Sequence, residues 1–332
     1  MKTIAIVGAT GNQGASVAES FLSLPDWHVR CITRNPSSQS AQTLASLGAN
    51  VIKADLSDLS SLRSAFAETH VVFVNTDFWG PYLACKNSDE AFIRELQHGR
   101  NAVIAAAGVP TLERFIYSVL APIKKHSRGK YSQSYHWDSK AEIMEYIETE
   151  MPELAEKTSY IILGAYATNP LFMPRWDPSV RKYRLMVPLK KEQNMPIIAA
   201  RESTGAFVSA LIGEAPRTRL LAYDSYLSMG ETVEAWAKAT GYEADLVEMK
   251  AEAMYDRFGI PWEVLEAPGF ISEFGYAAGI EGVIHPSQLK VPVQTDSFEE
   301  WLKKRNWKDI LSGGKEELNS IVEAQSITGA PS

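Results

Sequence analysis

The sequence has few features that would indicate secretion or a membrane. Only two cysteines, Cys31 and Cys85, occur in 332 residues, and Cys31 falls in an expected buried strand. One disulfide is arithmetically possible, but we expect two reduced thiols. No run of about 18 apolar residues occurs, so no membrane span is expected. Residues 1–7 are too short an apolar run for a signal peptide, and we expect a cytoplasmic protein.

Basic charge is also scarce. The chain has 33 Lys and Arg against 40 Asp and Glu, a net charge of -7, which argues against a nucleic-acid surface. The six histidines have no Cys or carboxylate partners at ligand spacing, so no metal site is expected. No Gly-x-Ser-x-Gly nucleophile elbow is present. The 45% apolar and 22% charged residues are ordinary for a globular protein.

Short apolar runs alternate with helical patterns over the first 165 residues. The pattern predicts helices at residues 14–24, 40–47, 59–67, 91–107 and 139–149, the last opened by a capping box of Ser139 and Glu142. It predicts strands at residues 4–7, 27–33, 50–53, 71–75, 114–118 and 159–163. Strands separated by helices pair in parallel and are buried on both faces. We therefore expect an α/β fold with a Rossmann-type doubly wound sheet.

The pattern breaks after residue 165. Residues 169–196 are rich in Pro, Met and aromatics without a period, and later runs predict strands at 195–200, 219–224 and 244–250 and helices at 204–212 and 232–240. Ser297 with Glu300 forms a second capping box. We expect a Rossmann domain at 1–165, to which residues of about 195–225 return, and a smaller α+β substrate domain at 166–325. Residues 325–332 are expected to be frayed.

A glycine-rich loop follows the first strand. Gly8 allows a tight turn, Gly11 lets the backbone approach a diphosphate, and Gly14 lets the next helix pack against the strand. The loop also contains Thr10, Asn12 and Gln13. Because the N-terminal end of a helix favours negative charge, this context predicts dinucleotide binding.

The end of the second strand selects the dinucleotide. NAD-binding proteins place a carboxylate there, whereas this chain has Arg34, whose guanidinium can bind a 2′-phosphate. NADP(H) is therefore the expected cofactor. Further contacts are expected after the third and fourth strands, with the adenine at Asp55 and Leu56 and with the nicotinamide ribose at Asn75, Thr76 and Phe78.

These residues resemble the NmrA-like family, an atypical branch of the short-chain dehydrogenases. The similarity is carried by the loop at residues 8–14, the turn at 33–36, the His-aromatic-Asp-x-Lys segment at 136–142 and the stretch 165–170 with Tyr166 and Asn169. The resemblance implies NADP(H) binding, with residues 165–170 closing over the nicotinamide side. It also implies a redox sensor or co-regulator, a reductase of secondary metabolism, or a relative that forms rings without net hydride transfer.

The usual Tyr-x-x-x-Lys pair of short-chain dehydrogenases is altered. Lys140 is the evident lysine, but His136 stands four residues before it and Tyr135 is displaced by one. Lys140 is expected to hold the nicotinamide ribose, and the proton donor is left open among Tyr135, His136 and water. Ser118 either positions a ligand or is a satisfied strand-end serine.

Large apolar side chains are dense in the irregular regions. We expect a pocket for a bulky, partly hydrophobic molecule, lined by Trp79, Phe172, Trp176, Phe270 and Phe274. The alternative is that these side chains form an ordinary second core. The lining favours a reductase of a bulky aromatic or hydrophobic small molecule in secondary metabolism. A sensor with a protein partner and a non-redox cyclase or isomerase are the alternatives, and either a monomer or a homodimer is compatible.

Overall fold

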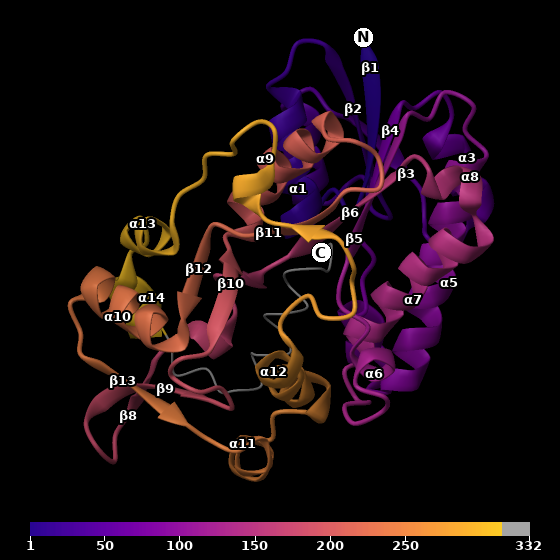
Figure 1. Ribbon diagram of the computed structural model, residues 1–332. Coiled ribbons are helices and arrows are strands. Elements are labelled where there is room, and N and C mark those ends of the chain that lie inside the picture. The colour runs from indigo at the N-terminus through magenta and orange to yellow at the C-terminus, as the bar shows by residue number, and fades with distance from the viewer. Residues whose placement is uncertain (314–332) are drawn as a thin grey trace.

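An eight-stranded sheet forms the centre of the molecule, as the computed structural model shows for residues 1–313 (Figure 1). Its order is β14-β11-β6-β5-β4-β1-β2-β3, and every neighbouring pair is parallel. The strands are β1 (Lys2–Val7), β2 (Trp27–Thr33), β3 (Asn50–Lys53), β4 (Val71–Val74), β5 (Arg114–Val119), β6 (Thr158–Leu163), β11 (Arg219–Ala222) and β14 (Val283–Ile284). The expected Rossmann-type sheet is confirmed, and its order reverses between β1 and β4.

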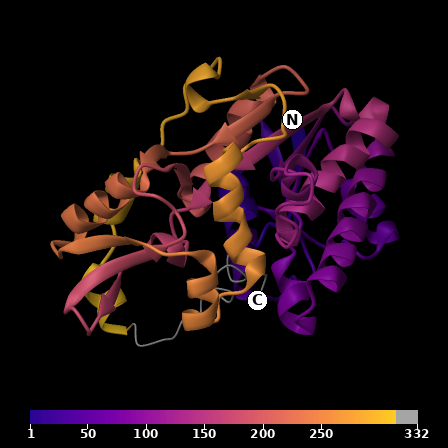
Figure 2. The same cartoon turned by 60° about the horizontal axis from the view of Figure 1, so that its bottom comes forward.

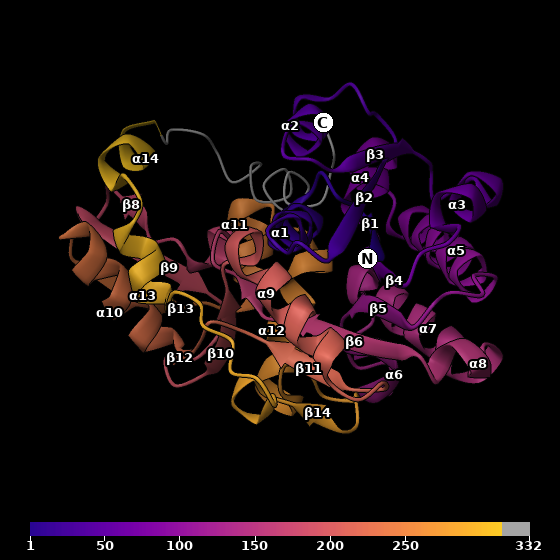
Figure 3. The ribbon, with the colours of Figure 1, turned by 90° about the horizontal axis from the view of Figure 1, so that it is seen from above.

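Helices cover both faces of this sheet (Figure 3). One face carries α1 (Asn12–Leu22), α2 (Gln39–Ser46) and α9 (Ala200–Gly213), and the other carries α3 (Leu59–Phe66), α5 (Ser88–Ala107) and α7 (Tyr135–Glu150). Successive strand residues point to opposite faces. Ile4 and Ile6 accordingly pack with the first set of helices, and Ala5 and Val7 with the second.

The rest of the chain builds two smaller three-stranded sheets beside the large one. Their strands are β7 (Ala165–Tyr166), β10 (Asn194–Ile198) and β12 (Ser225–Ser228) in one sheet, and β8 (Arg175–Asp177), β9 (Lys182–Val187) and β13 (Ala244–Glu248) in the other. The chain returns to the large sheet through α9, β11 and β14, whereas β10 stays in a small sheet.

Short helices complete the structure. They are α4 (Trp79–Cys85), α6 (Ile123–His126), α8 (Pro152–Ala155), α10 (Met229–Thr240), α11 (Ala251–Phe258), α12 (Trp262–Phe274), α13 (Phe298–Lys303) and α14 (Trp307–Gly313), with 3-10 turns η1 (Pro170–Phe172) and η2 (Pro286–Gln288). Helix α12, orange in Figure 2, stands between the smaller sheets and the helices of the N-terminal half.

Several expected boundaries were wrong, and the caps explain why. Helix α7 begins at Tyr135, not at 139, and Ser139 lies inside it with its hydroxyl donating to Glu95 instead of capping. The N–H of His136 is instead accepted by Glu263 of α12. Helix α9 begins at Ala200, not 204, and α5 begins three residues before the expected 91. Other ends shift by one to three residues.

Other expectations can be compared directly. The capping box of Ser297 and Glu300 is confirmed. Cys31 is buried, Cys85 is partly exposed, and both thiols are free. In residues 1–313, helices long and apolar enough to cross a bilayer are absent, as are groups of three or more metal-ligating side chains. Residues 325–332 lie outside the described part of the chain.

Candidate active site

Two adjoining cavities lie at the carboxyl ends of the central strands. The smaller has a volume of about 70 Å³ and the larger about 210 Å³, and both are lined by Asn75 and Asp77, which follow β4. Since the sheet order reverses beside β4, the two cavities lie at the topological switch point, where open α/β sheets bind ligands.

The glycine loop borders the smaller cavity with the geometry that its spacing predicts. Gly8 has a φ of +73°, in the left-handed region. A Cβ on Gly14 would lie 2.2 Å from the Gly8 carbonyl oxygen, so only glycine permits this approach of α1 to the loop. Helix α1 has Gly11 as its N-cap, without a side-chain cap or an acidic residue in its first turn. Its first N–H groups thus remain available for an anion.

Arg34 also lines the smaller cavity. It is exposed, follows β2, and shares the lining with Asp55, Leu56 and His98. His98 was not predicted to be a site residue, and burial lowers the pKa of its imidazole. A guanidinium with an exposed position beside a cavity can turn toward a phosphate.

Asp77 connects the two cavities. Its Oδ1 accepts the Gly80 N–H at 3.0 Å, while Oδ2 is buried without a hydrogen-bond partner among the described residues. Burial raises the pKa of this carboxyl. A buried acceptor without a donor is rare in folded proteins and suits a ligand hydroxyl.

Lys140 is held inside the protein. Its Nζ lies 2.7 Å from the Thr76 carbonyl oxygen, 2.9 Å from Thr76 Oγ1 and 2.7 Å from Glu95 Oε1. Glu95 is fully buried and also accepts hydrogen bonds from the hydroxyls of Thr76 and Ser139. An ammonium has three protons, so internal acceptors occupy all of them.

His136 has a different setting. Its Nδ1 lies 2.6 Å from Glu263 Oε1, and its backbone N–H donates to the same oxygen at 2.8 Å. The imidazole lines the larger cavity, with its ring centroid 4.9 Å from that of Trp79. Tyr135 does not line either cavity, and its ring meets the edge of Phe92 at 5.8 Å.

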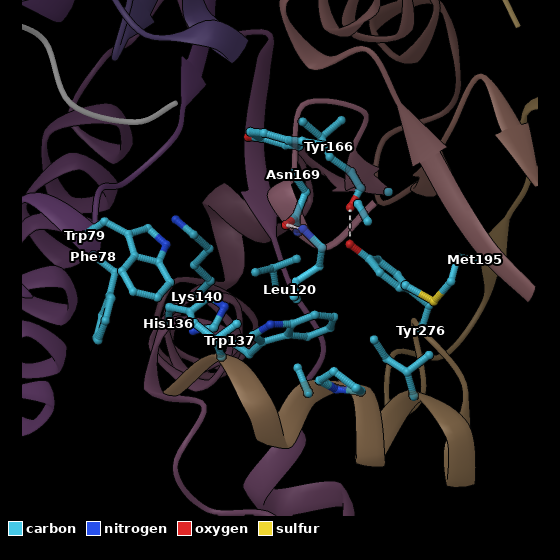
Figure 4. Close-up of a pocket in the computed structure, with 18 of the residues that line it drawn as sticks. Phe78, Trp79, Leu120, His136, Trp137, Lys140, Tyr166, Asn169, Met195 and Tyr276 are labelled. Atoms are coloured by element: carbon cyan, nitrogen blue, oxygen red, sulfur yellow. Dashed lines mark hydrogen bonds between the residues drawn. The ribbon is translucent and has the colours of Figure 1, made fainter. Parts of the chain in front are cut away.

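The remainder of the larger cavity is mostly apolar. Figure 4 shows Trp79, His136 and Lys140 on one side and Tyr276 with Met195 on the opposite side. Helix α12 supplies part of the wall through Val264, Ala267, Pro268 and Ile271. The Tyr276 hydroxyl donates to the Leu163 carbonyl at 3.0 Å, so its polar end is already satisfied.

The fold gathers most of the predicted site residues. The smaller cavity is lined by Gly8, Thr10, Gly11, Arg34, Asp55, Leu56 and Asn75. The larger is lined by Gln13, Asn75, Thr76, Phe78, Trp79, Ser118, His136, Lys140, Tyr166, Asn169 and Phe172.

Six predicted residues lie outside both linings. They are Asn12, Gly14, Tyr135, Trp176, Phe270 and Phe274. Trp176 is exposed on β8 against Tyr183, and Phe270 is fully buried beside Phe274. These two α12 aromatics pack on His126, because they point to the helix face away from the cavity.

Comparisons with known proteins agree with this geometry. The model of the NmrA-like family matches residues 1–302. The NmrA-like family domain-containing oxidoreductase himF of Aspergillus japonicus is 30% identical over 284 residues, covering 79% of this chain and 80% of the relative. The corresponding oxidoreductase ptmS of Penicillium ochrochloron is 31% identical over 261 residues, covering 72% and 73%.

Solved structures share the fold. NmrA, a negative transcriptional regulator solved with NADP, has a TM-score of 0.71 at 19% identity, covering 95% of this chain and 98% of its own. Leucoanthocyanidin reductase of Vitis vinifera, solved with NADPH, has a TM-score of 0.66 at 15% identity, covering 91% and 98%. The family model, the relatives and the sheet order agree, and the chain belongs to the NmrA-like family.

Proposed function

We propose that this protein is an NADP(H)-dependent reductase of a bulky, largely apolar small molecule of secondary metabolism. One observation carries the proposal: a second, apolar cavity of about 210 Å³ adjoins the nucleotide-type cavity and has an imidazole in its wall. The oxidoreductase names of the fungal relatives and the NADP and NADPH in the solved neighbours support it.

The residues present fit an NADP(H) molecule. The free N–H groups of α1 suit the diphosphate, Arg34 suits the 2′-phosphate, and the unpartnered Asp77 Oδ2 suits a ribose hydroxyl. The bound cofactor supplies the hydride. Lys140 would hold the turn after β4 in place through Thr76, because its protons are already engaged.

His136 is the proton donor in this proposal. A carbonyl carbon that gains a hydride leaves an oxygen that needs one proton, and the cavity-lining imidazole, when protonated, can deliver it. Tyr135 has the right chemistry but faces Phe92 outside the cavity. The apolar wall opposite would hold the body of the substrate by hydrophobic contact.

Labelled cofactor tests hydride transfer. Purified protein is incubated with NADPH deuterated at the transferable position and with a panel of polycyclic ketones and cyclic imines. Deuterium in a reduced product supports the reductase. Product formed without the label would support a cyclase or isomerase, because the same imidazole could move protons alone. Nucleotide binding that changes capture of a protein partner, without product, would support a sensor.

The Arg34→Ala substitution tests the cofactor assignment. We expect the affinity for NADP to fall about 10- to 100-fold, because a charge-assisted contact is lost, while the affinity for NAD changes little. Titration calorimetry measures both. Lys53→Ala, at the end of the neighbouring strand β3 and outside both cavities, is the matched control. Equal losses for the two nucleotides would refute this role of Arg34.

A further inference from the structure

Helix α12 holds the segment that begins α7 through three glutamates. Glu263 binds His136, Glu266 accepts the backbone N–H groups of Ser132 and Gln133, and Glu273 accepts the Tyr131 hydroxyl at 3.0 Å. Only Glu263 reaches an imidazole. Its other carboxylate oxygen accepts the Ser88 hydroxyl at 2.9 Å.

The pair is shielded from water. The side chain of Glu263 is 2% exposed and that of His136 is 14% exposed. A carboxylate accepts hydrogen bonds and cannot donate them. A neutral imidazole that meets a carboxylate at Nδ1 must therefore carry its proton there, and Nε2 is left with the lone pair.

We propose that Glu263 is a positioning residue that fixes His136 in the Nδ1–H tautomer and so makes Nε2 the proton-transfer atom of the larger cavity. The inference rests on the proposed function and deepens it. During reduction the Nε2–H bond breaks and an O–H bond forms on the substrate, which accepts the hydride at carbon. The imidazole is left neutral with its Nδ1–H bond to Glu263 intact, and solvent returns the proton to Nε2.

The same helix also shapes the substrate side. Ala267, Pro268 and Ile271 line the larger cavity within two turns of Glu263. A bulky molecule against this wall and the proton donor are thus oriented by one rigid element, which favours a defined distance between them.

The tautomer can be measured without any substrate. Protein labelled with 15N-histidine is examined by 1H–15N correlation spectroscopy under conditions where the ring is neutral, and the His136 signals are those that vanish in His136→Gln. We expect the wild type to carry the proton on Nδ1. In Glu263→Leu no acceptor remains for Nδ1–H, so the proton should no longer be held on Nδ1 and the Nε2–H tautomer should appear. Glu266→Gln, on the same helix, should leave the tautomer unchanged.

The outcomes separate this inference from the proposed function. With a substrate from the panel of ketones and imines, Glu263→Leu should lower kcat about 10- to 100-fold, the usual loss for a supporting hydrogen bond, while KM changes less than about threefold. Glu263→Asp, which keeps the carboxylate, should recover part of kcat and the Nδ1–H tautomer. A wild-type Nε2–H tautomer, or an Nδ1–H tautomer that persists unchanged in Glu263→Leu, overturns the inference even if the protein reduces ketones. The expected tautomers without reduction of any probe would leave Glu263 as a positioning residue and refute the reductase.

Discussion

Single residues decide how each basic side chain near the cavity can act. Lys140 and His136 both meet a buried glutamate, but with different consequences. Glu95 and Thr76 take every proton of the Lys140 ammonium, so this lysine is bound within the protein. Glu263 takes only one nitrogen of His136 and leaves the other at the cavity. The pattern of acceptors, more than the residue type, thus supports a structural role for Lys140 and the proposed proton transfer by His136.

Replacing Lys140 by Ala should destabilise the fold. The free energy of unfolding should fall by about 3–5 kcal/mol, because the Glu95 carboxylate would be buried without its counter-ion. Urea unfolding measures the change. In Lys140→Met/Glu95→Gln the charge is gone from both sides, and we expect a markedly smaller loss than in Lys140→Ala. If Lys140→Ala unfolds like the wild type, the ion pair has no structural role.

The sequence identifies some of these residues and not others. Gly8, Gly11 and Arg34, which line the smaller cavity, could be predicted because their positions depend on local spacing after a strand. Glu95 and Glu263 have no such signal, since they act on side chains 45 and 127 positions away. The Ser139–Glu142 spacing was misleading: a capping box and a buried serine that binds a distant carboxylate look alike in sequence.

At the scale of elements, the main helices of residues 1–165 were predicted but several of their starts were not, and α12 was missed because it lies in a stretch without a clear helical period. The alternation of apolar runs located every strand from β1 to β6 within one or two residues. The starts of α7 and α9 depend on distant carboxylates: Glu263 accepts the His136 N–H in the first turn of α7, and Asp224 accepts the N–H of Ala199, the N-cap of α9. Such caps cannot be predicted from the local sequence, because the capping residues lie far away along the chain.

The contact between α1 and α9 supports the helix that follows the glycine loop. A Cβ on Gly205 of α9 would lie 2.2 Å from the Ser16 carbonyl oxygen of α1. Gly205→Ala should lower the free energy of unfolding by about 1–3 kcal/mol through overpacking. Gly213→Ala, at the end of the same helix with open space around its Cβ, should be neutral or stabilising. Chemical denaturation compares the two, and equal effects would contradict this close packing.

The junction of α6 and α7 gives a pH dependence. Asp138 is buried and accepts the Lys124 N–H at 3.0 Å, and burial raises the pKa of its carboxyl to about 6. Between pH 4 and 6 the folded protein therefore binds more protons here than the unfolded chain does. The contribution of Asp138 to stability is present at about pH 4 and is lost as the pH rises through 6.

Asp138→Asn should remove this dependence, because the amide oxygen keeps the acceptor and never ionises. The unfolding free energy of the variant minus that of the wild type should increase by about 2–3 kcal/mol as the pH rises from 4 to 7. Urea titrations at four or five pH values measure the difference. A difference that stays constant over this range would show that Asp138 ionises normally.

At the scale of the whole molecule, one apolar cluster runs from the large sheet to the smaller ones. It includes Ala5 and Val7 of β1, Ile143 of α7, and Trp236 and Trp301 of α10 and α13. Residues of both 1–165 and 166–313 line the larger cavity, whereas the described residues that line the smaller cavity all fall within 7–98. The division into two domains remains a prediction, and the continuous core favours cooperative behaviour of both parts.

We expect NADPH to stabilise the entire chain in one transition. At a concentration of 100 times its Kd, a ligand that binds only the folded state adds about 2.7 kcal/mol, which should raise Tm by about 4 °C for a protein of this size. Scanning calorimetry should show one peak, with equal calorimetric and van 't Hoff enthalpies, that moves as a whole. At the same concentration NADH should move it less, because Arg34 then has no 2′-phosphate to bind, and in Arg34→Ala the NADPH shift should fall to the NADH value. If two peaks appear and NADPH shifts only one of them, the apolar cluster does not couple the unfolding of residues 1–165 and 166–313. Nucleotide binding would then stabilise only the large sheet and its helices.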